Sequence, residues 1–261
     1  MTAALLFDAC AGPGHPRRLD VSSATVDGTS FHIIAADGRT LHSEDLVGAV
    51  IGVRFHGSDR RVRIDSVRPD PADPALLLHA ISIEQPDGKW NPLCGVAPDG
   101  SRAAFPVSGR GLPDGTLASG GAGDVEIVCT SGGQGKCLRL GYHPWAKQRD
   151  GSAMLPAFNA CVRMMRADYA GSGTSETRDG TLIYVFDELG VRPREPNQVL
   201  EFEAGWDEHG AVCVRHPRIR ALASLDQIAA SSPRLKGHVG RSCTREAARA
   251  LGALIYNSSR V

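Results

Sequence analysis

Cys161 is the residue of this sequence with the clearest potential for covalent chemistry. His143 precedes it and Asp168 follows it along the chain. A cysteine acts as a nucleophile when a nearby imidazole holds the thiolate and backbone N–H groups stabilise the developing oxyanion. These residues predict a cysteine-dependent site, with Cys161 as nucleophile, His143 as base, and Asp168 as the group that orients or polarises the imidazole.

The pattern around Cys161 also has a purely structural interpretation. Apolar and aromatic residues recur at helical spacing from Phe158 to Tyr169, which predicts an amphipathic helix over 157–169 that ends at Gly171. Asp168 falls near the same stripe. Cysteines on the apolar face of a helix are commonly buried and inert. The sequence therefore leaves open whether Cys161 is a nucleophile or part of the core.

Aromatic and charged residues near this helix predict a pocket. Tyr142, His143 and Trp145 follow a predicted short strand at 138–142, and Tyr169 ends the helical stripe. Together with Asp168, they are the expected lining of a site for non-covalent acid/base or pericyclic cyclisation. We also expect Lys136 and Arg163 to contact substrate, although Arg163 or Arg139 is equally suited to pair with Asp168.

Strand signals fill the first half of the chain. Alternating residues over 47–67 with a turn at 57–60 predict a hairpin, and the Pro-rich stretch 70–74 predicts a break. Further strands are expected at 76–83 and 124–130. This pattern is typical of an antiparallel barrel or sandwich.

The second half of the chain mixes strands and helices. The sequence predicts a strand at 181–186, a hairpin of 199–206 with 211–215, and a final helix over 244–256 capped by Thr244. We therefore expect a β-rich α+β fold. Residues 1–25 form a flexible arm, 26–128 a β-rich region, and 129–261 a mixed region that makes one compact unit with the part before it.

Charge and composition narrow the range of expected partners and the expected location of the protein. The 29 basic residues balance the 29 acidic ones, which argues against a nucleic-acid partner. The sequence contains no apolar run long enough to span a membrane and no secretory signal pattern, so we expect a cytoplasmic protein. The basic cluster 215–220 is expected to be solvated, or to contact an anionic partner such as the phosphopantetheine arm of a carrier protein.

Seven cysteines are spread along the chain, and the odd number leaves at least one thiol free. A bridge between Cys129 and Cys137 is expected only outside the cytosol. No CxxC pair or His pair has metal-ligand spacing, and no nucleotide-binding motif occurs, so neither a metal nor a cofactor is expected.

Several linked motifs resemble the bacterial ADYC-domain family. They include Lys136–Trp145, the run from Ala160 to Gly171, and the segment from Trp206 to Val214. The resemblance implies no activity. Ala170 stands where the family has the cysteine that ends Ala-Asp-Tyr-Cys. If that family cysteine forms a bridge, the resemblance implies that its partner is unpaired here.

A second, local resemblance is to the nucleophile segment of the YkuD-type L,D-transpeptidases. It rests on Cys161-Val162-Arg163-Met164, on Asp168, on the position of His143, and on Gly180-Thr181 before a strand. The usual Ser-His-Gly-Cys is replaced by Phe158-Asn159-Ala160-Cys161. The resemblance implies acyl transfer on a thiol.

The preferred hypothesis is a cytoplasmic cysteine-dependent enzyme that transfers, cyclises or hydrolyses an acyl, thioester or amide substrate in specialised metabolism. The substrate would be a small molecule or carrier-bound. The alternatives are the non-covalent cyclase and a non-catalytic binding or interaction module. The sequence defines neither the substrate nor the oligomeric state.

Overall fold

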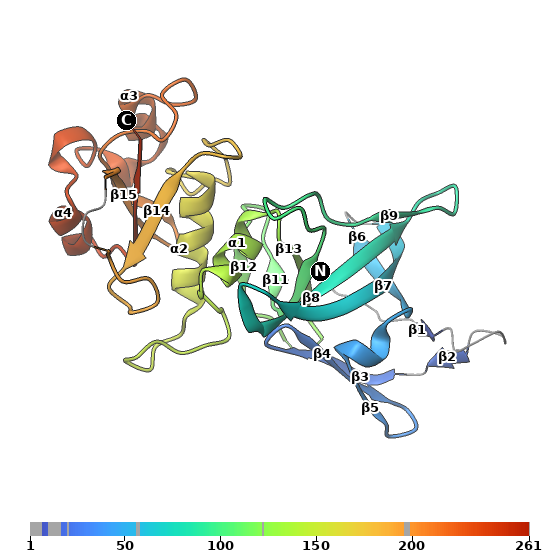
Figure 1. Cartoon of the computed structure of the whole chain (residues 1–261). Helices are drawn as coiled ribbons and strands as arrows, with labels where there is room; N and C mark the ends of the chain where they lie inside the picture. The colour runs from blue at the N-terminus through green and yellow to red at the C-terminus, as the bar shows by residue number, and fades with distance from the viewer. Residues whose placement is uncertain are drawn as a thin grey trace. The chain divides into compact units, whose positions relative to one another are not determined.

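The computed structural model describes residues 7–9, 17–19, 21–55, 58–121, 123–195 and 199–260 of the chain. The chain divides into two compact units (Figure 1). The first is drawn from residues up to 111 and from 117–135. The second comprises residues 112–116 and 136–261.

The first unit is built on one large antiparallel sheet. Its strands follow the order β13-β10-β8-β7-β6-β1-β2, and β9 pairs with β8. The strands are β1 (Phe7–Ala9), β2 (Arg17–Leu19), β6 (Val50–Phe55), β7 (Ser58–Asp70), β8 (Asp73–Glu84), β9 (Trp90–Pro92), β10 (Ala104–Ser108) and β13 (Val125–Cys129). The predicted β6–β7 hairpin and the break between β7 and β8 are both confirmed, although residue 57 of the predicted turn lies outside the described residues.

A second, three-stranded sheet belongs to the same unit. It contains β3 (Val21–Asp27), β4 (Ser30–Ala35) and β5 (Thr40–His42), followed by the 3-10 turn η1 (Ser43–Leu46); β11 (Arg110–Gly111) and β12 (Leu117–Ala118) form a separate pair. Thus part of the predicted arm forms strands.

One apolar core joins the two sheets of the first unit. Phe31 and Ile33 of β4 pack with Ile51, Ile64 and Ile81 of the large sheet. Alternation along each pleated strand sends these side chains to one face. The β-rich antiparallel prediction is confirmed, and no closed barrel is formed by the strands that the structure describes.

The second unit combines a four-stranded antiparallel sheet with short helices. The sheet has the order β14-β17-β15-β16. The elements of the second unit are α1 (Gly133–Arg139, which begins in the first unit), α2 (Leu155–Arg166), β14 (Ile183–Asp187), β15 (Glu201–Asp207), β16 (Gly210–Val214), α3 (Leu225–Ser231), η2 (Pro233–Leu235), η3 (Gly240–Ser242), α4 (Arg245–Ala250) and β17 (Ile255–Ser259). Helix α2 packs on β15, β16 and β17.

Three local predictions are wrong. Residues 138–142, predicted as a strand, contain the end of α1 and a turn. The final helix stops at Ala250 because Gly252 adopts a left-handed φ of 87°, and the chain then enters the sheet as β17. Helix α2 ends at Arg166, so Asp168 lies beyond the helix and not on its stripe.

None of the described helices combines the length and the apolar character needed to cross a bilayer.

Candidate functional site

Cys161 lies in the middle of α2 and is fully buried. Its sulfur is bonded to that of Cys137, and the two Cα atoms are 5.8 Å apart. A sulfur in a disulfide has no thiolate to attack a carbonyl, and this one has no exposed surface. The structure therefore corrects the assignment of Cys161 as a nucleophile, because the side chain ties α1 to α2.

The other described cysteines are also in disulfides. Cys94 bonds to Cys129 in the first unit, and Cys213 bonds to Cys243 in the second. The expected bridge between Cys129 and Cys137 is thus wrong, since each has a different partner. Cys10 lies outside the described residues.

Tyr142, the first member of the predicted pocket, is a core residue. Its hydroxyl donates a 2.7 Å hydrogen bond to Asp187 Oδ2. Burial, and then the charge of Asp187, raise the pKa of Tyr142 well above its usual value. The phenol therefore remains neutral, and it is sealed from substrate.

Asp187 is bound on all sides by donors. The backbone N–H groups of Leu189, Gly190 and Val191 donate to Oδ1, and the N–H of Arg192 donates to Oδ2 at 2.7 Å. A carboxylate held in this way organises a loop, because it satisfies four backbone donors at once. Asp187 therefore fixes the turn after β14 and positions Tyr142 there.

His143 and Trp145 form a stacked pair. Their ring centroids are 5.0 Å apart with an interplanar angle of 11°, and Trp145 is exposed. The structure places His143 beside Trp145, while Cys161 is engaged with Cys137. The sulfur of Cys161 is therefore not available for the expected Cys–His catalytic pair.

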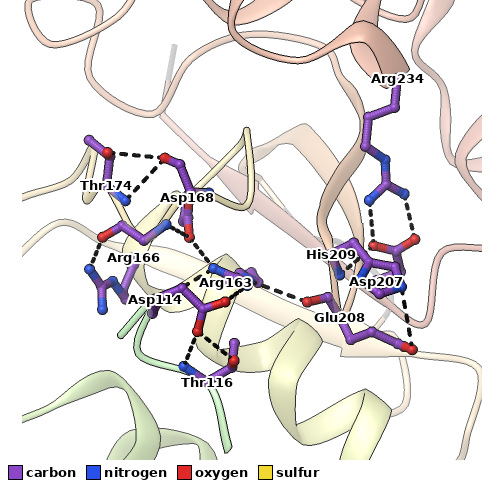
Figure 2. Close-up of polar contacts among 12 residues, drawn as sticks. Asp114, Thr116, Arg163, Arg166, Asp168, Thr174, Asp207, Glu208, His209 and Arg234 are labelled. Atoms are coloured by element: carbon purple, nitrogen blue, oxygen red, sulfur yellow. Dashed lines mark hydrogen bonds and ion pairs between the residues drawn. The ribbon is translucent and has the colours of Figure 1, made fainter. Parts of the chain in front are cut away.

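Arg163, in the last turn of α2, and Asp168, just beyond the helix, form a buried ion pair (Figure 2). Arg163 Nη1 lies 2.6 Å from Asp168 Oδ2, and Arg163 Nη2 lies 2.6 Å from Asp114 Oδ2. Asp168 also accepts the backbone N–H groups of Ser172 and Gly173. Both residues are thus occupied in fixing the segment after α2, which is the pairing that the sequence left as an alternative to catalysis.

The residues around this ion pair also shift the pKa values of neighbouring carboxyl groups. Burial acts to raise the pKa of Asp114, but hydrogen bonds from Thr116 and then Arg163 lower it below its usual value. Burial, and then the charge of Asp168, raise the pKa of Glu176. These opposite shifts follow from the positions of the partners in a structural network, so they do not by themselves indicate catalysis.

Tyr169, the next residue, belongs to a second buried network. Its hydroxyl donates to Glu203 Oε1 at 3.1 Å and accepts the backbone N–H of Arg218 at 2.7 Å. The Arg218 guanidinium binds Glu203 through two nitrogens and also donates to the carbonyls of Met164 and Met165. Burial, and then the charge of Glu203, raise the pKa of Tyr169 well above its usual value.

Asn257 extends this network into the C-terminal strand. Its Nδ2 donates to Glu203 Oε2 at 2.7 Å, and its Oδ1 accepts from Trp206 Nε1 at 2.8 Å. Both oxygens of the Glu203 carboxylate thus accept hydrogen bonds, as a buried charge requires.

Arg218 was expected on a solvated basic surface, and this is wrong. Its side chain is 1% exposed, and His216 is buried as well. The sequence does contain the acidic partner of Arg218, since Glu203 lies in the preceding strand hairpin. Only the fold, however, brings the two residues together. Lys136, also expected to bind substrate, lies 3.4 Å from the exposed Asp179.

Two neighbouring depressions lie elsewhere, on the first unit. Their volumes are about 500 and 360 Å³, and they share Arg60, Glu84, Gln85 and Pro86 as lining residues. Arg61 lines the first and is 3.3 Å from Glu84. None of the residues predicted as catalytic or substrate-binding lines either depression, so these depressions are a location that the sequence did not indicate.

The sequence profile of the ADYC domain matches residues 43–220, more than half of the chain. The chain belongs to the ADYC-domain family. No curated protein and no solved structure matches it. The local resemblance to L,D-transpeptidases is not supported by these comparisons.

The motif that gives the ADYC domain its name is structural in this chain. Ala167 takes a left-handed φ of 50° at the end of α2, Asp168 binds Arg163, and Tyr169 binds Glu203. Ala170 occupies the position of the family cysteine. The loss of that family cysteine leaves no unpaired cysteine within the described part of the chain, because the six cysteines there form three bridges.

The ADYC match ends before a strand that the second unit needs. β17 lies between β14 and β15 in the sheet, and it carries Asn257. The matched segment therefore completes its sheet and its buried network with residues C-terminal to the match.

Proposed function

We propose that this ADYC domain is a non-catalytic binding or interaction module. The observation that carries the proposal is the buried Cys137–Cys161 disulfide, because it engages the sulfur on which the cysteine-dependent enzyme relies. Asp168 and Tyr169 support the same interpretation, since each is buried and bonded to a structural partner. The non-covalent cyclase would need these groups open to substrate.

The proposed partner contact is the pair of depressions on the first unit. Arg60 and Arg61 present guanidinium groups there, next to the Glu84 carboxylate and the Gln85 amide. Depressions of this volume fit a small ligand or a side chain of a larger one. The mixed charge favours a polar partner that both donates and accepts hydrogen bonds, in keeping with a small-molecule or carrier-bound ligand and not with nucleic acid.

We also infer that the protein matures in an oxidising compartment, and not in the cytoplasm as the sequence predicted. Three disulfides connect six cysteines. Such bridges form and persist in oxidising environments and are rare in the cytosol of mesophiles. The location is testable by comparing the thiol content of the protein isolated from cells with that of the reduced, denatured chain.

Alkylation of the native protein tests the proposal against the cysteine-dependent enzyme. Native protein is treated with iodoacetamide, quenched, reduced, labelled with a second reagent and mapped by peptide mass. We expect Cys137 and Cys161 to carry only the second label. Rapid native alkylation of Cys161 would contradict the module and favour the enzyme. Peptides from the same protein reduced before the first reagent provide the control.

A further inference from the structure

Two histidines face each other on the outer side of the three-stranded sheet. His32 of β4 and His42 of β5 are direct cross-strand partners. Their ring centroids are 5.1 Å apart, and the ring planes differ by 2°. The strand neighbours Phe31 and Ile33 are buried in the core, so the pleat turns His32 to the opposite face. The two imidazoles are therefore side by side and accessible from solvent.

The surroundings of the pair are polar. Thr25 of β3 is the partner of His32 on its other side. Asp45, in the turn that follows β5, accepts the backbone N–H of His42 at 2.9 Å. This contact fixes the chain at His42 and keeps a carboxylate beside it. Asp27 and Glu44 add further negative charge in the adjoining residues of β3 and η1.

We propose that His32 and His42 chelate a divalent transition-metal ion of the class that prefers imidazole nitrogen, such as Zn²⁺ or Ni²⁺. Neutral imidazole is a favoured ligand for these ions. Two nitrogens bound to one tetrahedral ion at ~2.1 Å stand about 3.4 Å apart. The stacked rings have parallel planes, so both must rotate about their side-chain torsions to direct one nitrogen each at the ion.

The site has two protein ligands, and water completes the coordination. No group of three or more potential ligands is found among the residues that the structure describes. An ion on the pair would link β4 to β5, the edge strand of this sheet. Binding would therefore stabilise the strand pair. This inference is independent of the proposed partner surface, which lies on other strands.

Calorimetric titration of the native protein with NiCl₂ and with ZnCl₂ tests the site. The experiment uses a Cys10→Ser background, which removes the one cysteine outside the three bridges. We expect binding of a single ion at about pH 7.5. His32→Gln and His42→Gln should each weaken binding roughly tenfold or more, since each removes half of the protein ligands.

His209→Gln is the matched control, because His209 is an exposed histidine in a turn of the second unit. It should bind the ions as the background protein does. Melting temperatures measured without metal show whether each variant folds. The proposal is overturned if the two single variants keep the background affinity, or if His209→Gln weakens binding as much as they do. The double variant should bind more weakly than either single one, because it removes the imidazole that each single variant retains.

Discussion

Arg218 and Glu203 form a two-point ion pair in the interior of the second unit. Arg218 Nε is 3.1 Å from Glu203 Oε2, and Arg218 Nη2 is 3.0 Å from Oε1. The side chains are 1% and 0% exposed. An interior charge is costly unless it is paired and fully hydrogen-bonded, and Tyr169 and Asn257 supply the remaining donors. This pair therefore makes β15, β17 and the segment at 218 depend on one another.

Glu203→Gln should destabilise the protein strongly. The substitution leaves the Arg218 guanidinium buried without its counter-charge, and breaking a buried pair in this way costs about 3 to 5 kcal/mol. Urea unfolding at neutral pH measures the change. Asp37→Asn is the control, because it removes an ion pair with Arg39 at the surface and should leave the unfolding midpoint unchanged. Equal effects of the two variants would contradict the assignment.

Removing the Cys137–Cys161 bridge should lower stability without exposing a reactive site. The two cysteines are 24 residues apart in sequence, and closing a loop of this size stabilises a protein by roughly 3 kcal/mol. The double variant Cys137→Ala, Cys161→Ala should therefore unfold at lower urea concentration than the wild-type protein. The fully reduced wild-type protein should lose more, because reduction also opens Cys94–Cys129 and Cys213–Cys243. An unchanged midpoint in the double variant would argue against a bridge.

Gly171→Ala should be far more damaging than alanine at another glycine of similar backbone conformation. Gly171 has φ of +72°, and a Cβ there would lie 1.8 Å from the carbonyl oxygen of His209. The clash is with backbone, so the cost should be about 3 kcal/mol or more. Gly38, with φ of +84° and nothing within 4 Å of its Cβ position, should cost only about 1 kcal/mol.

A thermal melt of both glycine variants gives the comparison. If Gly38→Ala lowers the melting temperature as much as Gly171→Ala, the backbone conformation alone explains the cost. In that case the close approach of the ADYC motif segment to the turn at His209 has no separate effect on stability.

Local patterns in the sequence predicted the helices and strands that short-range residue spacing defines. The apolar stripe around Cys161 predicted α2, and alternation over 47–67 predicted β6 and β7. The error at the C-terminus has a local cause too. Thr244 caps the start of α4 as predicted, but Gly252 ends the helix. The chain then continues as β17, a strand that is buried on both faces. Such strands lack the polar alternation that marks a half-buried one.

The site could not be predicted because its identity depends on contacts between distant residues. The type and helical position of Cys161 suit both a nucleophile and a core residue, and only its proximity to Cys137 distinguishes them. Arg218 likewise sits in a run of basic residues that is typical of a solvated surface. Its burial follows from its meeting with Glu203 across the fold, and no short-range pattern encodes that meeting.

Acid should destabilise the first unit through His79. Its Nδ1 lies 3.0 Å from the carbonyl oxygen of Leu77, so Nδ1 carries the proton, and Nε2 accepts from the Ser43 hydroxyl at 2.8 Å. Burial lowers the pKa of His79 from 6.5 to about 4. The neutral ring is therefore the form that fits the interior.

The sign of the effect follows from proton linkage. Below about pH 6.5 the unfolded chain binds a proton at this histidine, while the folded protein does so only near pH 4. The stabilisation is thus present in full above pH 6.5 and is lost progressively as pH falls from 6.5 to about 4, with a loss of roughly 2 to 3 kcal/mol by pH 4.5. Urea unfolding at pH 7 and at pH 4.5 measures the difference. His79→Gln should reduce it by about that amount, whereas His209→Gln should leave it as in the wild-type protein. An unchanged difference in His79→Gln would show that other groups carry the acid sensitivity.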